Sequence, residues 1–152
     1  MRTLIVYDTS YGNTEKIALS ICAGMKEVGY DNVICKKVDS VTLDELKSAD
    51  VWIFGTPTHV GGATGALKRT LKSGIKSATS PKLGTAFDTR FAQIRKGGAQ
   101  KIQKIMESAG INIIVPPEWF IVEGMKGPLA HGEESKAVSF GRKIAGALRT
   151  RK

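Results

Sequence analysis

Hydroxyl and amide side chains gather in the segment that follows the first apolar run of the chain. Thr3–Tyr7 is largely apolar, and residues 8–14 then read Asp-Thr-Ser-Tyr-Gly-Asn-Thr, immediately before a helical pattern begins. Such side chains donate hydrogen bonds, and the first N–H groups of a helix favour an anion. The segment holds no Lys or Arg, so a phosphate here would be held by hydroxyls, backbone amides and the helix dipole. The same residue types also cap helices, so a plain capped turn is the alternative.

The spacing of the glycines and carboxylates excludes other phosphate sites. A triphosphate-binding P-loop needs Gly-x-x-x-x-Gly-Lys-Ser/Thr, and a dinucleotide site needs Gly-x-Gly-x-x-Gly after the first strand; neither pattern is present. A phosphorylated receiver domain needs an aspartate at the end of the third strand, where this chain has Gly55-Thr56. A monophosphate fits the first loop best.

Two later loops have the composition of ligand-binding segments. Gly55–Gly62 contains a proline and two adjacent glycines, which let a peptide turn over or approach a flat ring closely. Asp88–Gly98 is longer than a tight strand-to-helix connection, and loops of that length in small domains are often functional. Each segment is equally compatible with an ordinary connection.

The apolar pattern that must position these loops alternates between strand and helix periods. The expected strands are Thr3–Tyr7, Val33–Val38, Asp50–Gly55, Lys82–Phe87, and a last strand, Ile111–Val115 with Trp119–Val122, interrupted by Pro116-Pro117. The expected helices are one with apolar residues from Ile17 to Val28 that stops at Gly29, Leu43–Ala49 capped by Thr42 or Ser40, a weaker one with Leu67 and Leu71, Ala99–Ala109, and Glu133–Arg149.

Five strands alternating with helices predict an α/β fold, a doubly wound three-layer sandwich whose five-stranded parallel sheet is covered on both faces. No repeat or linker interrupts residues 1–152, which are expected to form a single domain. In such a sheet the ligand crevice lies beyond the carboxyl ends of the strands, so the loops after strands one, three and four are expected to meet there.

Composition excludes several classes of protein. With 41% hydrophobic and 24% charged residues the chain is globular, and no apolar run approaches the roughly 20 residues of a membrane span. The N-terminus lacks a secretory signal, so we expect a cytoplasmic protein. Cys22 and Cys35 have no metal-binding or disulfide-scaffold spacing and are expected to be small buried hydrophobes. Trp52 and Trp119 lie in expected strands and are assigned to the core.

Charge is unevenly distributed along the chain. The formal net charge is +9; residues 1–60 carry 6 basic and 8 acidic residues, whereas residues 61–152 carry 17 and 6. An excess of this size permits an acidic protein or a polyanion as partner, because net charge affects association and solubility but says nothing of the fold.

The whole chain resembles the flavodoxin family. The segment Thr9-Ser10-Tyr11-Gly12-Asn13-Thr14 resembles the flavodoxin phosphate loop, and Gly55-Thr56-Pro57-Thr58 and Ala86-Phe87-Asp88-Thr89-Arg90 resemble its two ring-binding loops. Residues 120–124, followed by Gly127-Pro128-Leu129 and Gly132-Glu133, are similar to the family's C-terminal segment. The fifth strand has no insertion, which is typical of the short-chain type.

The resemblance implies a non-covalently bound FMN and a soluble, low-potential electron carrier between redox proteins. It implies cofactor-binding roles for Thr9, Ser10, Tyr11, Gly12, Asn13, Thr14, Thr56, Pro57, Thr58, His59, Val60, Gly61, Gly62, Asp88, Thr89, Arg90 and Phe91. A peptide near Val60, Gly61 and Gly62 is expected to turn over and hydrogen-bond the flavin N5 when N5 gains a hydrogen. No catalytic residue and no metal is implied.

Two features depart from the family pattern. Flavodoxins usually stack the flavin between Trp and Tyr, and the ring-binding loops here offer only His59 and Phe91. Flavodoxins are also typically acidic, whereas this chain is basic. We expect positive charge from Arg90, Arg95, Lys96, Lys68, Arg69 and Lys72 to favour anionic reduced flavin and to steer acidic, ferredoxin-like partners toward the flavin edge. We expect the protein itself to be a monomer or weak dimer.

Two other functions remain open at this point. The first is an FMN-dependent NAD(P)H quinone or flavin reductase on the same fold, against which stands the absence of a nicotinamide fingerprint. The second is a cofactor-free nucleic-acid binder using the basic half, against which stand few aromatic residues and no recognised motif.

Overall fold

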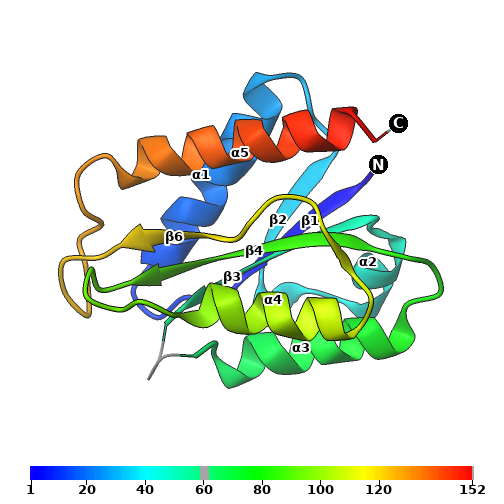
Figure 1. Ribbon diagram of the computed structural model, residues 1–152, viewed down its shortest axis with the longest axis horizontal. Coiled ribbons are helices and arrows are strands. Elements are labelled where there is room, and N and C mark those ends of the chain that lie inside the picture. The colour runs from blue at the N-terminus through cyan, green and yellow to red at the C-terminus, as the bar shows by residue number, and fades with distance from the viewer. Residues whose placement is uncertain (59–61, 152) are drawn as a thin grey trace.

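Parallel strands alternate with helices in the computed structural model, which describes residues 1–58 and 62–151 (Figure 1). The elements are β1 (Thr3–Tyr7), α1 (Asn13–Glu27), β2 (Val33–Lys37), a 3-10 turn (Val38–Ser40), α2 (Leu43–Ser48), β3 (Val51–Pro57), α3 (Gly65–Ser77), β4 (Leu83–Arg90), α4 (Gly98–Ser108), β5 (Asn112–Ile113), β6 (Glu118–Ile121) and α5 (Glu133–Arg149).

The sheet runs in the order β2-β1-β3-β4-β5, and β6 also pairs with β4. All of these pairings are parallel. β5 pairs with the start of β4 and β6 with its end, so the two form one edge strand broken around Pro116-Pro117, because proline has no N–H to donate to the ladder. This arrangement confirms the expected five-stranded, doubly wound sheet.

Helices cover both faces of the sheet (Figure 1). α1 and α5 lie on one face, where Ile5, Ile53 and Phe87 of the strands pack into one apolar core. α2, α3 and α4 cover the other, where Leu4, Trp52 and Phe54 belong to a second core. The alternation follows from the two-residue period of a strand. Trp52 is fully buried, as expected, and its Nε1 donates to the Leu46 carbonyl at 2.9 Å.

The helix boundaries follow local signals. α1 ends two residues before Gly29, which has a φ of +86°, and α2 begins at a capping box in which Thr42 and Glu45 hydrogen-bond reciprocally, so Thr42 and not Ser40 is the cap. α5 has the predicted limits. No helix within the described residues is both long and apolar enough to cross a membrane.

Both cysteines are free thiols, Cys22 on α1 buried and Cys35 on β2 partly buried. Burial raises the pKa of Cys22 above its ordinary 9.0. Burial, with further contributions from Cys22 and Glu15, raises the pKa of the Cys35 thiol from 9.0 to about 12. At neutral pH both therefore behave as small apolar side chains.

The raised pKa of Cys35 predicts a loss of stability in alkali. Between pH 9 and 12 the unfolded chain releases this proton while the folded chain retains it, so the free energy of unfolding decreases as pH rises. Replacing Cys35 with alanine is expected to remove roughly 1–2 kcal/mol of the decrease between pH 8 and pH 10.5. Urea denaturation of both proteins at the two pH values measures it, and equal pH dependence in both would contradict the prediction.

Candidate functional site

The loop from β1 to α1 presents hydroxyl groups at a helix start that no side chain caps. α2 and α3 are capped by threonine side chains, whereas α1 has Gly12 as its N-cap, with a φ of +87° and no side-chain cap, as α5 has Gly132. Thr9 Oγ1 accepts a hydrogen bond from the Gly12 N–H at 2.9 Å and so closes the turn. No side chain among the described residues accepts from the first N–H groups of α1, and such groups are favourable for an anion.

Hydrogen bonds join this first loop to the second and third. The Asp8 carboxylate accepts from the Thr9 N–H at 2.8 Å and from Thr64 Oγ1, at the start of α3, at 2.6 Å. Thr14 and Thr89 share a buried hydrogen bond of 2.9 Å between their hydroxyls. The three loops after β1, β3 and β4 are therefore held together at the carboxyl edge of the sheet, where the fold places ligand crevices.

The second loop is tied to the start of α4. The Thr58 N–H donates to the Thr89 carbonyl at 2.9 Å, and Thr58 Oγ1 accepts from the Gly98 N–H at 3.1 Å. Thr56 is fully buried, and its hydroxyl accepts from the Thr64 N–H at 3.1 Å. His59, Val60 and Gly61, together with the predicted peptide turnover, lie outside the described residues.

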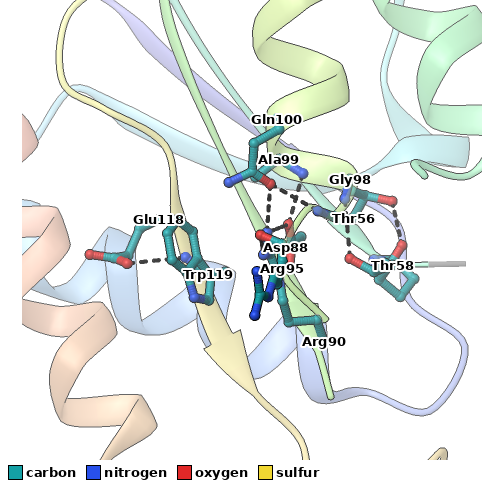
Figure 2. A network of polar contacts seen from close by, with 12 residues as sticks. Thr56, Thr58, Asp88, Arg90, Arg95, Gly98, Ala99, Gln100, Glu118 and Trp119 are labelled. Carbon is teal, nitrogen blue, oxygen red and sulfur yellow. Dashed lines mark hydrogen bonds and ion pairs between the residues drawn. The ribbon is translucent and has the colours of Figure 1, made fainter. Parts of the chain in front are cut away.

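A buried ion pair organises the third loop (Figure 2). Asp88 and Arg90 project from the same face of β4; Arg90 Nε donates to Asp88 Oδ1 at 2.8 Å and Nη2 to Oδ2 at 2.5 Å, with both side chains completely buried. Arg90 also donates to the Arg95 carbonyl at 3.0 Å and to Gln100 Oε1 at 2.7 Å. Asp88 Oδ2 accepts from the Ala99 N–H at 2.8 Å, and Gln100 Oε1 from the Gly97 N–H at 2.9 Å.

The pair corrects two sequence-based predictions about Arg90. β4 extends to Arg90, so the third loop spans only residues 91–97 rather than 88–98. Arg90 was expected to provide positive charge to the flavin, but its charge is neutralised by Asp88 within the protein. Gly97 is required beside the pair, because a Cβ there would lie 2.7 Å from Asp88 Oδ2 and 2.9 Å from Arg90 Cζ.

Trp119 covers the ion pair. The sequence-based assignment of Trp119 to the core was therefore wrong. The Arg90 guanidinium lies over its ring, with Cζ 4.6 Å from the ring centroid, and the residue is 37% exposed. β6 pairs with β4 in a register that sets Trp119 opposite Asp88, on the same face of the sheet. Stacking on an aromatic ring is a favourable environment for a desolvated guanidinium.

The described loops enclose a cavity of about 490 Å³, a volume typical of a small-molecule site. Of the predicted site residues, the cavity is lined by Thr9, Ser10, Tyr11, Asn13, Thr14, Pro57, Thr58, Thr89, Arg90 and Phe91. Four of the predicted residues are not among the lining residues: Gly12, Thr56, Gly62 and Asp88. Gly12 forms the turn before α1, and the side chains of Thr56 and Asp88 accept hydrogen bonds from backbone N–H groups of the second loop and of α4.

Three lining residues were not singled out from the sequence: Ile94, Val122 and Met125. Val122 lies in the C-terminal segment that resembles the family's, but nothing local indicated that residues 122–127 form a wall of the site. Gly127, with a φ of +102°, brings that backbone against the Asn13 side chain, where a Cβ would lie 2.8 Å from Oδ1. Lys126 Nζ lies 6.0 Å from the centroid of the Tyr11 ring, so a cation stands beside the first loop after all.

The lining of the cavity combines two kinds of side chain. The first are the hydroxyls of Thr9, Ser10 and Thr14 at the uncapped start of α1, and the second are the apolar side chains of Phe91, Ile94 and Met125. A phosphate suits the first and a flat aromatic ring the second. The lining residues that the structure describes include no Trp, and Trp119 is held against Arg90.

Comparisons with known proteins agree with this arrangement. The family model described as flavodoxin matches residues 5–137. A flavodoxin from Clostridium saccharobutylicum is 32% identical over 89 residues, 59% of this chain and 56% of that protein. An NAD(P)H dehydrogenase (quinone) from Geotalea daltonii is 28% identical over 121 residues, 61% of this chain and 59% of that protein. The chain thus spans just over half of each of these curated relatives.

A solved flavodoxin structure from the domain Archaea has the same fold. It superposes with a TM-score of 0.80 at 21% identity, covering 98% of this chain and 99% of that one. Because the family model covers most of the chain and the fold agrees over nearly all of it, the chain belongs to the flavodoxin family, whose cofactor is FMN.

Proposed function

We propose that the chain binds FMN in the cavity at the carboxyl edge of the sheet, within one domain of residues 1–152, and acts as a low-potential electron carrier between redox proteins. The observation that carries the proposal is that one cavity combines the uncapped start of α1 and the hydroxyls of Thr9, Ser10 and Thr14 with the apolar side chains of Phe91, Ile94 and Met125. When bound, FMN supplies one- and two-electron chemistry, and the protein supplies binding and electrostatics.

The proposed roles follow the two kinds of lining residue. Hydroxyls of Thr9, Ser10 and Thr14, with the N–H groups that open α1, hold the phosphate. Pro57, Thr58 and Phe91 contact the ring, and Val60 to Gly62 supply the peptide that responds to its reduction. Asp88 and Arg90 set the position of the loop that follows them.

Electron transfer by a bound flavin requires no acid–base side chain from the protein. The lining residues, all within the described ranges, include no carboxylate, histidine or cysteine. These side chains therefore supply no group that takes up or releases a proton near neutral pH. Transfer of electrons to another protein requires none.

We also propose a cytoplasmic location and a redox protein as partner. The formal charge of +9 favours acidic, ferredoxin-like partners over basic ones, because complementary charge accelerates encounter. We propose that the carrier acts as a monomer or weak dimer and does not recognise a specific nucleic-acid sequence.

An FMN-dependent NAD(P)H quinone reductase is the second candidate. It is favoured by the name of the Geotalea relative and by a shallower hollow of about 420 Å³ beside the main cavity. Phe91 and Val122 line both spaces, so a second small molecule could lie next to the flavin.

Stepwise anaerobic reduction of the FMN-loaded protein distinguishes the two. A carrier is expected to accept electrons in two separable one-electron steps and to oxidise NADH or NADPH no faster than free FMN does, with or without a quinone. Saturable NAD(P)H oxidation that depends on quinone would establish the reductase instead. Protein that remains colourless after incubation with FMN would overturn both.

A further inference from the structure

Positive charge is concentrated on one helical face of the molecule. α3 and α4 cover the same face of the sheet and share one core (Figure 1). Gly65–Ser77 contains four basic residues and no acidic one, and Gly98–Ser108 contains two basic residues and only Glu107. Together with two residues of the loop before α4, they form what we term the basic face: Lys68, Arg69, Lys72, Lys76, Arg95, Lys96, Lys101 and Lys104.

The charges of the basic face are not neutralised within the described part of the chain. Seven of the eight side chains are exposed, and Lys68 is partly exposed. The ion pairs among residues 1–58 and 62–151 all lie elsewhere, and Arg90, which the sequence suggested as a member, is buried with Asp88.

The opposite helical layer has basic and acidic residues in more nearly equal numbers. α1 and α5 together carry six basic and four acidic residues, and Arg142 of α5 pairs with Glu27 of α1 at 2.9 Å. The basic face therefore carries more positive charge than the opposite helical layer, and an uneven distribution of charge helps to orient an incoming partner.

The basic face reaches the mouth of the cavity. Arg95 and Lys96 belong to the loop whose Phe91 and Ile94 line the cavity, and α3 and α4 begin at that edge of the sheet. Large apolar side chains stand exposed at the same mouth: Tyr11 at 51%, Phe91 at 36% and Met125 at 73%. An apolar patch next to a charged flank matches the composition of a transient protein interface.

We propose that the basic face is the docking surface for an acidic redox protein, which lies over α3 and α4 with its redox centre against the apolar mouth of the cavity. The inference rests on the proposed carrier function and adds where the partner binds. A protein is favoured over a nucleic acid because α3 and α4 contain no aromatic residue on which bases could stack, and because the face adjoins the cavity.

Two double variants with equal change in charge test the proposal. Lys72→Glu with Lys101→Glu reverses charge on the basic face, and Lys26→Glu with Lys143→Glu does so on exposed positions of α1 and α5. The probe is a purified acidic [2Fe–2S] ferredoxin, reduced and mixed with the FMN-loaded protein in stopped flow. We expect the second-order rate constant at low salt to decrease at least tenfold for the first variant and less than twofold for the second.

Binding measurements separate the docking surface from the cavity. Calorimetry of ferredoxin with the flavin-free protein measures docking alone. Quenching of FMN fluorescence measures the affinity of the cavity for FMN, and neither variant is expected to change that affinity. Equal losses in both variants, or none, would overturn the basic face as the docking surface. Tighter binding of duplex DNA than of ferredoxin, abolished by the first variant only, would also overturn it. Ferredoxin binding that persists without any FMN uptake would overturn the carrier function and leave the docking surface standing.

Discussion

Replacing Arg90 with methionine is expected to lower the free energy of unfolding by about 3–5 kcal/mol, because the buried Asp88 carboxylate would lose its counter-charge. Domains of this size are stable by only about 5–15 kcal/mol, so the loss is a large fraction of the total. The third loop would lose its tie to Arg95 at the same time, and FMN affinity is expected to decrease with it. Urea denaturation measures the first effect and FMN fluorescence the second.

Two further variants isolate the cause of that loss. Arg142→Met breaks an exposed ion pair of similar length and is expected to cost less than about 1 kcal/mol. Asp88→Leu combined with Arg90→Met removes both buried charges, so it should recover part of the stability even though α4 loses its bond from Ala99 to Asp88. If Arg90→Met were no more costly than Arg142→Met, the ion pair would not organise the loop.

Replacing Ser10 with leucine is expected to weaken FMN binding at least 30-fold, or about 2 kcal/mol. The side chain lines the cavity beside the uncapped start of α1, where leucine would occupy the space proposed for the phosphate and remove a hydroxyl donor. Riboflavin has no phosphate, so its affinity should change less than threefold. Fluorescence titration with both flavins measures the difference.

A serine outside the site provides the control for this second substitution. Ser108 is exposed at the end of α4, at the opposite edge of the sheet, and Ser108→Leu should leave both affinities unchanged. Equal weakening of FMN and riboflavin by Ser10→Leu would mean that the phosphate binds elsewhere.

The parts of the fold that follow from local patterns were predictable from the sequence. Glu133–Arg149 has the predicted limits because its apolar residues follow the helical period and a glycine precedes it. The segment Thr9–Thr14 lies where predicted, between a strand and a helix that flank it directly in the chain, although the helix begins at Asn13, two residues earlier than the sequence suggested. Both features depend on residues close together in sequence.

The parts that depend on distant contacts were not predictable in this way. β4 continues to Arg90 because β6, about 30 residues later, supplies a hydrogen-bonding partner for its last residues. If the predicted strand had been extended from Phe87 to Arg90, the i, i+2 spacing of Asp88 and Arg90 would have indicated an ion pair on one face of the sheet. Met125 and Lys126 reach the first loop through a contact between Gly127 and Asn13 that no local pattern reveals.

Mapping of FMN onto the protein by amide chemical shifts in NMR tests the central claim most directly. Addition of one equivalent of FMN to flavin-free protein is expected to shift the amides of residues 9–14, 56, 58–62, 89–94 and 122–126, and riboflavin is expected to reproduce all of these changes except those at 9–14. Shifts centred on another surface, or none at saturating FMN, would contradict the assignment of the cavity as the flavin site.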